Sequence, residues 1–204
     1  MQSLMQQALG TQWQQLPSGL QRHYAVNDIS QVHIEQGTLT IDYPRWMQPY
    51  LTLLFWMGAL INRRGTDIPT QVMRCLTHQQ EHWQRVLSFT DGKILRFNSR
   101  LSYIGGNQLL EYTNASQALC MAVSVIDHKL HYEGQYFLIQ LGKLRFKLPE
   151  WLVLGHTTIV EEALNDQQFK MDFRLTHPWF GELFSYKGVF TNLPPKAPSF
   201  RKGM

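Results

Sequence analysis

Several features that would point to a particular chemistry are scarce or missing in this chain of 204 residues. Charged residues make up 17% of it, against about a quarter in ordinary globular domains. The two cysteines, Cys75 and Cys120, stand in no CxxC or other ligand spacing, so a disulfide framework is not indicated. Phosphate-binding loops, dinucleotide-binding glycine motifs and serine-hydrolase motifs are also missing. We therefore expect neither a nucleotide nor any other cofactor.

Positive charge is concentrated near the C-terminus. The formal net charge is +4, and residues 193–204 carry Lys196, Arg201 and Lys202 without any acid, which leaves 4 − 3 = +1 for the rest. Nucleic-acid binding needs a basic face, so no nucleic-acid partner is expected. The proline-rich composition of 193–204 predicts a disordered basic tail behind a single domain over 1–192. No basic residue precedes Arg22, which argues against a signal peptide and favours the cytoplasm.

Alternating apolar residues predict a sheet after two short N-terminal helices that Pro17 interrupts. The first expected hairpin turns at Gln36-Gly37, and a stronger one turns at Asp91-Gly92. About ten strands follow one another through short turns, without a helix long enough to connect parallel strands. The predicted fold is mainly β (α+β), a large curved antiparallel sheet that forms a barrel or half-barrel.

The segment 50–61 is apolar except for Thr52 and Gly58. It is too short to cross a bilayer, which needs about 20 residues. A helix that is apolar all round is usually buried, so we expect the sheet to be packed around it. The alternative is a helix that lies on a membrane surface, with Arg45, Arg63 and Arg64 near lipid phosphates.

One stretch matches a zinc-protease signature. His78-Gln79-Gln80-Glu81-His82 has the pattern H-x-x-E-H, which binds zinc only on a helix. Here the alternation of Trp83, Arg85, Leu87 and Phe89 predicts a strand. Histidines four apart in a strand lie about 13 Å from each other, so no metal site is expected.

The adjacent pair Glu161 and Glu162 is the first candidate for a binding site. Neighbouring strand residues point to opposite faces, so one of the two carboxylates must face the apolar side of the sheet. A buried carboxylate needs a partner, and its pKa rises. Arg174 and His177 are the expected partners, because their strand comes next in the chain. The alternative is a solvated strand edge.

A second group of candidates is formed by Arg174, His177 and Tyr186, with Asp172 nearby. Histidine and tyrosine can exchange protons or form hydrogen bonds to a ligand. His177-Pro178 ends one predicted strand, and Tyr186 lies on the next. A histidine with only a structural role at a strand end is the simpler interpretation.

The order of several sequence motifs resembles a known bacterial family. The motifs include LGTQWQQLPSGLQRHY, GALINRRGTDIPTQV, HWQRVLSFTDGK and FRLTHPWFGELFSYKGVF. Together they resemble the domain of unknown function DUF 4166, over about residues 9–190. Members of that family are often fused to NAD(P)-binding, saccharopine-dehydrogenase-like domains. The resemblance implies an NAD(P)-dependent oxidoreductase as a separate partner, and it adds Arg22, His23 and Tyr24 to the residues able to do chemistry.

The sequence favours a binding or accessory domain over an enzyme. The abundance of aromatic residues, 12% of the chain, suggests an apolar cavity inside the curved sheet that holds an apolar or amphipathic small molecule. One alternative is an enzyme that uses Glu161, Arg174, His177 and Tyr186, or that works beside the oxidoreductase. The other is a membrane-surface protein anchored by residues 50–61.

Overall fold

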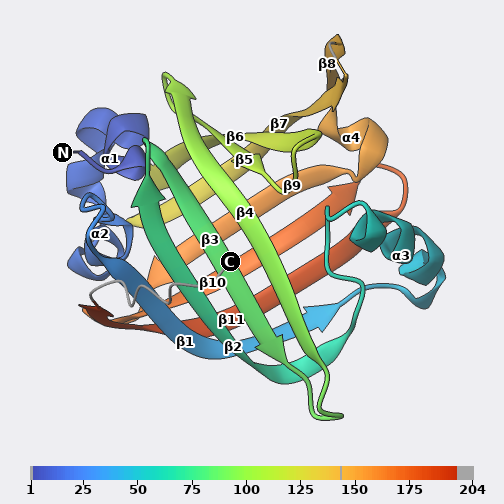
Figure 1. The fold of residues 1–204 in the computed structure, drawn as a ribbon, viewed down its shortest axis with the longest axis horizontal. Helices are drawn as coiled ribbons and strands as arrows, with labels where there is room; N and C mark the ends of the chain where they lie inside the picture. Colours follow the sequence, from blue (N-terminus) through green and yellow to red (C-terminus); the bar gives the residue numbers. More distant parts are fainter. Residues whose placement is uncertain (1, 143, 197–204) are drawn as a thin grey trace.

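The computed structural model describes residues 2–142 and 144–196, and it shows a closed antiparallel β-barrel with short helices at its two ends (Figure 1). The strands are β1 (Val32–Asp42), β2 (Gly65–Thr77), β3 (Gln80–Ser88), β4 (Ile94–Gly105), β5 (Gln108–Tyr112), β6 (Gln117–Ile126), β7 (Lys129–Leu141), β8 (Leu144–Pro149), β9 (His156–Ala163), β10 (Gln168–His177) and β11 (Gly181–Lys196). The prediction of a mainly β fold with a curved antiparallel sheet is confirmed.

Ten of the strands form the wall of the barrel. Each strand from β1 to β7 pairs with the next, β9 to β11 do the same, and β11 pairs with β1. The ring closes because β7 also pairs with β9, through residues 130–133. The rest of β7 pairs with β8, which extends beyond the barrel with the short helix α4 (Glu150–Val153). Closure leaves no open edge along the ring.

The tight turns follow the signals in the sequence. Asp91-Gly92 joins β3 to β4, and Gly92 has the positive φ of 82° that this turn requires. Asp127 and His128 join β6 to β7 with φ values of 50° and 60°, the left-handed pair of a two-residue hairpin. The predicted hairpin at Asp91-Gly92 is confirmed.

The predicted turn at Gln36-Gly37 is wrong, because β1 runs through both residues without a break. Gly37 pairs with Phe190 on β11, and a Cβ atom at Gly37 would lie 2.0 Å from the carbonyl oxygen of Val189. Glycine serves here to let two strand backbones approach closely and does not reverse the chain.

The N-terminal residues cover one end of the barrel, which we call the plug end. They form α1 (Leu4–Leu9), a 3₁₀ helix η1 (Gly10–Gln15) and α2 (Ser18–Tyr24), with the break at Pro17 that the sequence predicts. Ser3 caps α1, since its hydroxyl accepts from the backbone of Gln6 while the Gln6 side chain accepts from Ser3. Leu20 and Tyr24 of α2 are fully buried against the barrel core.

The apolar helix lies at the other end, which we call the α3 end, and not inside the sheet (Figure 1). The helix α3 covers Gln48–Trp56, and only its Leu51 and Leu54 are buried. The side chains of Trp46, Leu53 and Trp56 are 60%, 51% and 79% exposed. The prediction that the sheet packs around this segment is therefore wrong. Alternate residues of the strands occupy most of the barrel interior, which leaves no room for a helix.

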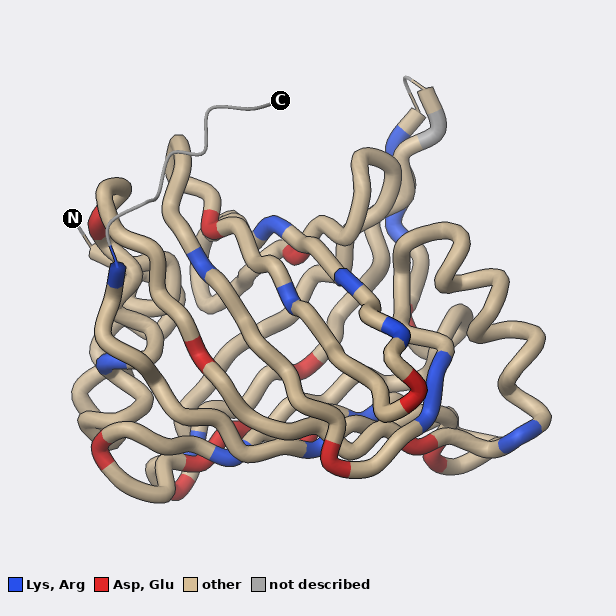
Figure 2. Tube along the Cα trace, turned by 60° about the horizontal axis from the view of Figure 1, so that its bottom comes forward, with Lys and Arg blue, Asp and Glu red and all other residues tan. Residues whose placement is uncertain are grey.

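The remaining surface features concern charge, the membrane and the C-terminus. Basic and acidic residues are interspersed along the barrel in the view of Figure 2. Among the described residues, no helix is long and apolar enough to cross a bilayer. Strand β11 continues to Lys196, four residues into the segment for which disorder was predicted, and positions 197–204 of that segment lie outside the described residues.

Candidate functional site

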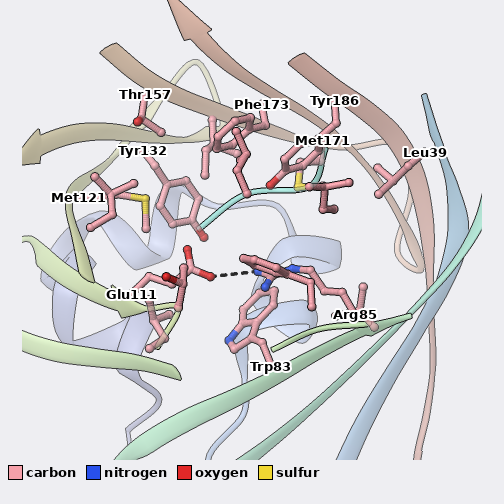
Figure 3. A pocket seen from close by; sticks show the side chains of 18 of the residues that line it. Leu39, Trp83, Arg85, Glu111, Met121, Tyr132, Thr157, Met171, Phe173 and Tyr186 are labelled. Carbon is pink, nitrogen blue, oxygen red and sulfur yellow. Dashed lines mark hydrogen bonds and ion pairs between the residues drawn. The ribbon is translucent and has the colours of Figure 1, made fainter. Parts of the chain in front are cut away.

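The barrel encloses a cavity of about 140 Å³ (Figure 3). Most of its wall is apolar or aromatic, with contributions from nearly every strand of the ring. The side chains labelled in Figure 3 are Leu39, Trp83, Arg85, Glu111, Met121, Tyr132, Thr157, Met171, Phe173 and Tyr186. At the plug end the wall is completed by His23 and Tyr24 of α2, and at the α3 end by residues 59–61, which follow α3.

A buried ion cluster supports the cavity near the plug end. Arg74 of β2 is 1% exposed, and its Nε atom donates to Glu35 at 2.7 Å while Nη1 donates to Glu81 at 3.1 Å. Burial raises the pKa of Glu81 to about 7, although the Arg74 charge opposes that shift. Arg74 also donates to the carbonyl oxygen of His23, which ties the barrel wall to α2.

The same guanidinium affects His23. The imidazole Nδ1 lies 3.1 Å from Oδ1 of Asn192 and 3.3 Å from Oε1 of Glu35. Burial, and then the nearby Arg74 charge, hold the pKa of His23 well below its usual value, so the ring is neutral at neutral pH. Its Nε2 atom is buried without a hydrogen-bond partner among the described residues.

A second polar cluster joins α2 to the far wall. The Tyr24 hydroxyl donates to Oε2 of Glu161 at 2.6 Å, and it also contacts the hydroxyl of Tyr132 on β7. Glu161 is 4% exposed, and burial raises the pKa of its carboxyl to about 7. Burial, followed by the Glu161 charge, also raises the pKa of both tyrosines. Within this cluster, Glu161 is therefore the one group that can hold or release a proton near neutral pH.

A third cluster lies in the cavity wall itself. Arg85 of β3 donates to Glu111 of β5 at 3.2 Å and to the Ser99 hydroxyl at 2.9 Å (Figure 3). The Trp83 ring contacts two guanidinium groups, since those of Arg74 and Arg85 are each 4.8 Å from its centroid. Such cation–π contacts stabilise buried arginines beyond their ion pairs. Arg85 and Glu111 both keep 19% of their side-chain surface exposed.

The two adjacent glutamates point to opposite faces, as strand parity requires. Glu161 faces the cavity, whereas Glu162 lies outside and pairs with Lys129 at 3.3 Å and Lys170 at 3.5 Å. The partners expected for the inward carboxylate were Arg174 and His177, and this expectation is wrong. Although β9 and β10 do pair, Arg174 lies opposite Thr158, on the outer side of the wall.

The other predicted residues are divided between the inside and the outside of the barrel. Tyr186 lines the cavity with His23 and Tyr24. Arg174 pairs with Asp172 at 2.8 Å and Glu182 at 3.4 Å on the outer surface. His177 ends β10, and its Nδ1 accepts from the backbone of Trp179. Arg22 forms an exposed ion pair with Asp166. Glu161, Arg174, His177 and Tyr186 thus do not converge on one cleft.

The H-x-x-E-H stretch is not helical. His78 lies in the turn between β2 and β3 with a φ of 48°, and His82 is within β3, as predicted. Among residues 2–142 and 144–196, no three His, Cys, Asp or Glu side chains are grouped closely enough to hold a metal ion.

Sequence reasoning missed most of the charged residues of the interior, namely Glu35, Arg74, Glu81, Arg85 and Glu111. For one strand a signal was available. Glu81, Trp83 and Arg85 alternate with the same period as the buried Leu87, so one face of β3 holds them all. Charged residues on an apolar strand face indicate a polar cluster inside the fold.

Comparison with known proteins assigns a family. A family model described as Domain of unknown function (DUF4166) matches residues 16–190. The match spans most of the chain, so the protein belongs to this family, in agreement with the resemblance of its motifs. No curated protein and no solved structure matches the chain.

Proposed function

We propose that the barrel binds an apolar or amphipathic small molecule in its interior. The observation that carries this proposal is the cavity of about 140 Å³ with a mostly apolar and aromatic wall. An engineered protein cavity of about 150 Å³ with an apolar lining is large enough to bind benzene. The expected ligand is therefore about the size of one ring with a short substituent.

Polar groups without partners support a ligand with a polar end. Within the described residues, Nε1 of Trp83 and Oγ1 of Thr157 are buried and have no hydrogen-bond partner. Both residues line the cavity (Figure 3). Buried polar groups are rarely left unpaired, so the Thr157 hydroxyl, which can accept as well as donate, is available to orient a bound molecule.

The test uses two methionines that are both half-buried but face opposite sides of the wall. Met171 lines the cavity, whereas Met73 faces outward. Saturation-transfer NMR with toluene should show binding to the parent protein. Met171→Trp fills the cavity and should abolish that signal, and Met73→Trp should preserve it. An absence of toluene binding to the parent, or equal loss in both variants, would contradict the proposal.

The resemblance extends the proposal to a cellular role. We propose that the protein is bacterial and cytoplasmic, and that it holds an apolar substrate for an NAD(P)-dependent oxidoreductase. The free thiols of Cys75 and Cys120 support a reducing compartment. Affinity purification from a bacterial host of the family should recover such an enzyme with the parent protein. Recovery of no oxidoreductase would rule this partner out without affecting ligand binding.

A second candidate function is contact with a membrane surface at the α3 end. Exposed apolar side chains from three elements meet there. The ring centroids of Trp46 and Phe180 are 6.0 Å apart, and the Tyr50 hydroxyl donates to the Val153 carbonyl, which links α3 to α4. Tryptophan and phenylalanine favour the bilayer interface. Arg45 would favour anionic lipids, whereas Arg63 and Arg64 are paired with Asp91 at 2.6 Å and Asp42 at 2.9 Å.

Vesicle co-sedimentation tests this second candidate. The parent protein should sediment with vesicles that contain phosphatidylserine, and Trp56→Ser should weaken that binding. Ile29→Ser is the matched control, because Ile29 is 72% exposed and lies in the segment before β1, at the plug end. Equal binding of all three proteins would exclude α3 as the contact.

A further inference from the structure

The barrel interior contains more acidic than basic groups. Four carboxylates and two guanidinium groups point inward from the strands, and these are Glu35, Glu81, Glu111, Glu161, Arg74 and Arg85. With all six ionised, the interior would carry a net charge of −2. The neutral His23 ring adds no positive charge to it.

Both interior guanidinium groups are already engaged. Arg74 donates to two carboxylates and to the His23 carbonyl, and it is 1% exposed. Arg85 is paired with Glu111 and with the Ser99 hydroxyl. An anionic ligand would add a further negative charge to an interior in which both guanidinium groups already pair with carboxylates, and a buried charge without its own partner is costly.

Glu161, by contrast, has an oxygen that is free for a ligand. Its Oε2 atom accepts from Tyr24, while no hydrogen bond to Oε1 is found in the part of the chain that the structure describes. The residue lines the cavity, and the aromatic rings of Tyr132, Phe173 and Tyr186 line it as well. An acceptor oxygen in an aromatic cavity suits a cationic donor, because ring faces also attract cations.

We propose that the polar end of the ligand is a protonated amine that donates to Glu161, and that the cavity discriminates against carboxylates. This inference rests on the proposed binding function and specifies the class of ligand. An amine brings one positive charge to an interior with an excess of acids. It also completes the hydrogen bonding of Oε1 without breaking either arginine pair.

Binding of an amine would be linked to proton release. The charged or titratable groups that face Glu161 are Tyr24 of α2, Tyr132 of β7, Tyr186 of β11, Glu35 of β1, Arg74 of β2 and Arg85 of β3. Burial raises the pKa of Glu161 to about 7, and a nearby ammonium would lower it. Amine affinity should therefore fall as the pH drops below about 7. Under more acidic conditions the decrease in affinity should approach tenfold per pH unit.

The experiment compares three ligands of one size by isothermal titration calorimetry at pH 7. They are 2-phenylethylamine, 2-phenylethanol and phenylacetate. The amine should bind at least about tenfold more tightly than phenylacetate, and it should also bind more tightly than the alcohol. Phenylacetate binding as tightly as the amine, or the alcohol binding most tightly, would overturn the amine proposal alone. Failure of all three to bind would overturn the proposed function as well.

Two adjacent substitutions locate the effect. Glu161→Gln should weaken amine binding about tenfold and change phenylethanol binding less than about threefold. Glu162→Gln, on the outer face, should leave both affinities unchanged. Equal amine binding by the parent and Glu161→Gln would assign the amine to another group and refute the proposal. If Glu161→Gln fails to fold, the pH dependence of amine binding to the parent protein tests the proposal instead. An amine affinity that is constant from pH 5 to 8 would contradict a role for Glu161.

Discussion

The two ends of the barrel differ in what they bury. At the plug end, polar and charged side chains such as Arg74, Glu81 and Glu161 are almost completely buried beneath α2. At the α3 end, large apolar side chains such as Trp56 and Leu53 are exposed. From hydrophobicity alone, we would expect the charged side chains to be exposed and the large apolar side chains to be buried. The difference shows that position in the barrel, and not residue type, decides burial here.

The physical reason is that buried charges at the plug end satisfy one another. The Arg74 guanidinium is shared by two carboxylates, and Glu161 is hydrogen-bonded to Tyr24. The exposed residues of α3 have no such constraint, because a short helix cannot bury all its faces against the rim of a barrel. Only Leu51 and Leu54 of that helix reach the core.

The strongest test of this contrast is Arg74→Met. Removal of the guanidinium leaves Glu35 and Glu81 buried without their ion-pair partner, so the free energy of unfolding should fall by about 3–5 kcal/mol. Urea denaturation followed by circular dichroism measures this change. The control is Arg174→Met on the outer face, where an exposed pair is worth about 1 kcal/mol or less. Similar losses in the two variants would mean that burial does not distinguish the sites.

A second test concerns the pH dependence of stability. The pKa of Glu161 is about 7 in the folded state, against a reference value of 4.5, so its contribution to stability is complete below pH 4.5 and is lost as pH rises toward 7. Urea titrations should show the parent losing on the order of 3 kcal/mol relative to Glu161→Gln across that range.

The adjacent residue provides the control for this pH test. The pKa of Glu162 is lowered by its hydrogen bond and charge interaction with Lys129, so its small contribution has the opposite sign and is lost as pH falls. Parallel profiles for Glu161→Gln and Glu162→Gln would contradict the burial of Glu161.

The smallest effect is expected at the α3 end. Trp56 is 79% exposed, so Trp56→Ser should change the free energy of unfolding by less than about 0.5 kcal/mol. Leu51→Ala, on the buried side of the same helix, should cost about 2–5 kcal/mol. A large loss in Trp56→Ser, measured by thermal denaturation, would show that this side chain packs against the protein.

The sequence contains enough information for most of the strands and for a curved antiparallel sheet, because alternation and turn residues are local signals. It leaves a barrel and a half-barrel open as alternatives, because the β1–β11 and β7–β9 pairs that close the ring join distant segments. It also predicts that either Glu161 or Glu162 faces inward, since strand parity allows no other outcome. It does not show that Glu161 pairs with Tyr24, because that contact joins residues 137 positions apart. The partner comes from α2, which no pattern on β9 or β10 can indicate.

Two errors came from local signals that tertiary structure overrides. Gln36-Gly37 has the composition of a turn, but Gly37 is required by the close approach of β11. Residues 50–61 have the composition of a buried helix, but strand residues already occupy most of the barrel interior. In both cases the deciding neighbour is distant in the sequence, so a single-sequence pattern cannot reveal it.

The close contact at Gly37 also bears on the order in which the chain can fold. Its partner Phe190 is on β11, so the β1–β11 seam joins segments about 150 residues apart, and it cannot form on the ribosome until the last strand has emerged. Until then β1 has one unpaired edge available to other nascent chains. Strand β11, Gly181–Lys196, therefore acts as the closing strand of the barrel, and a ribosome that stalls before it would release a sheet prone to aggregation.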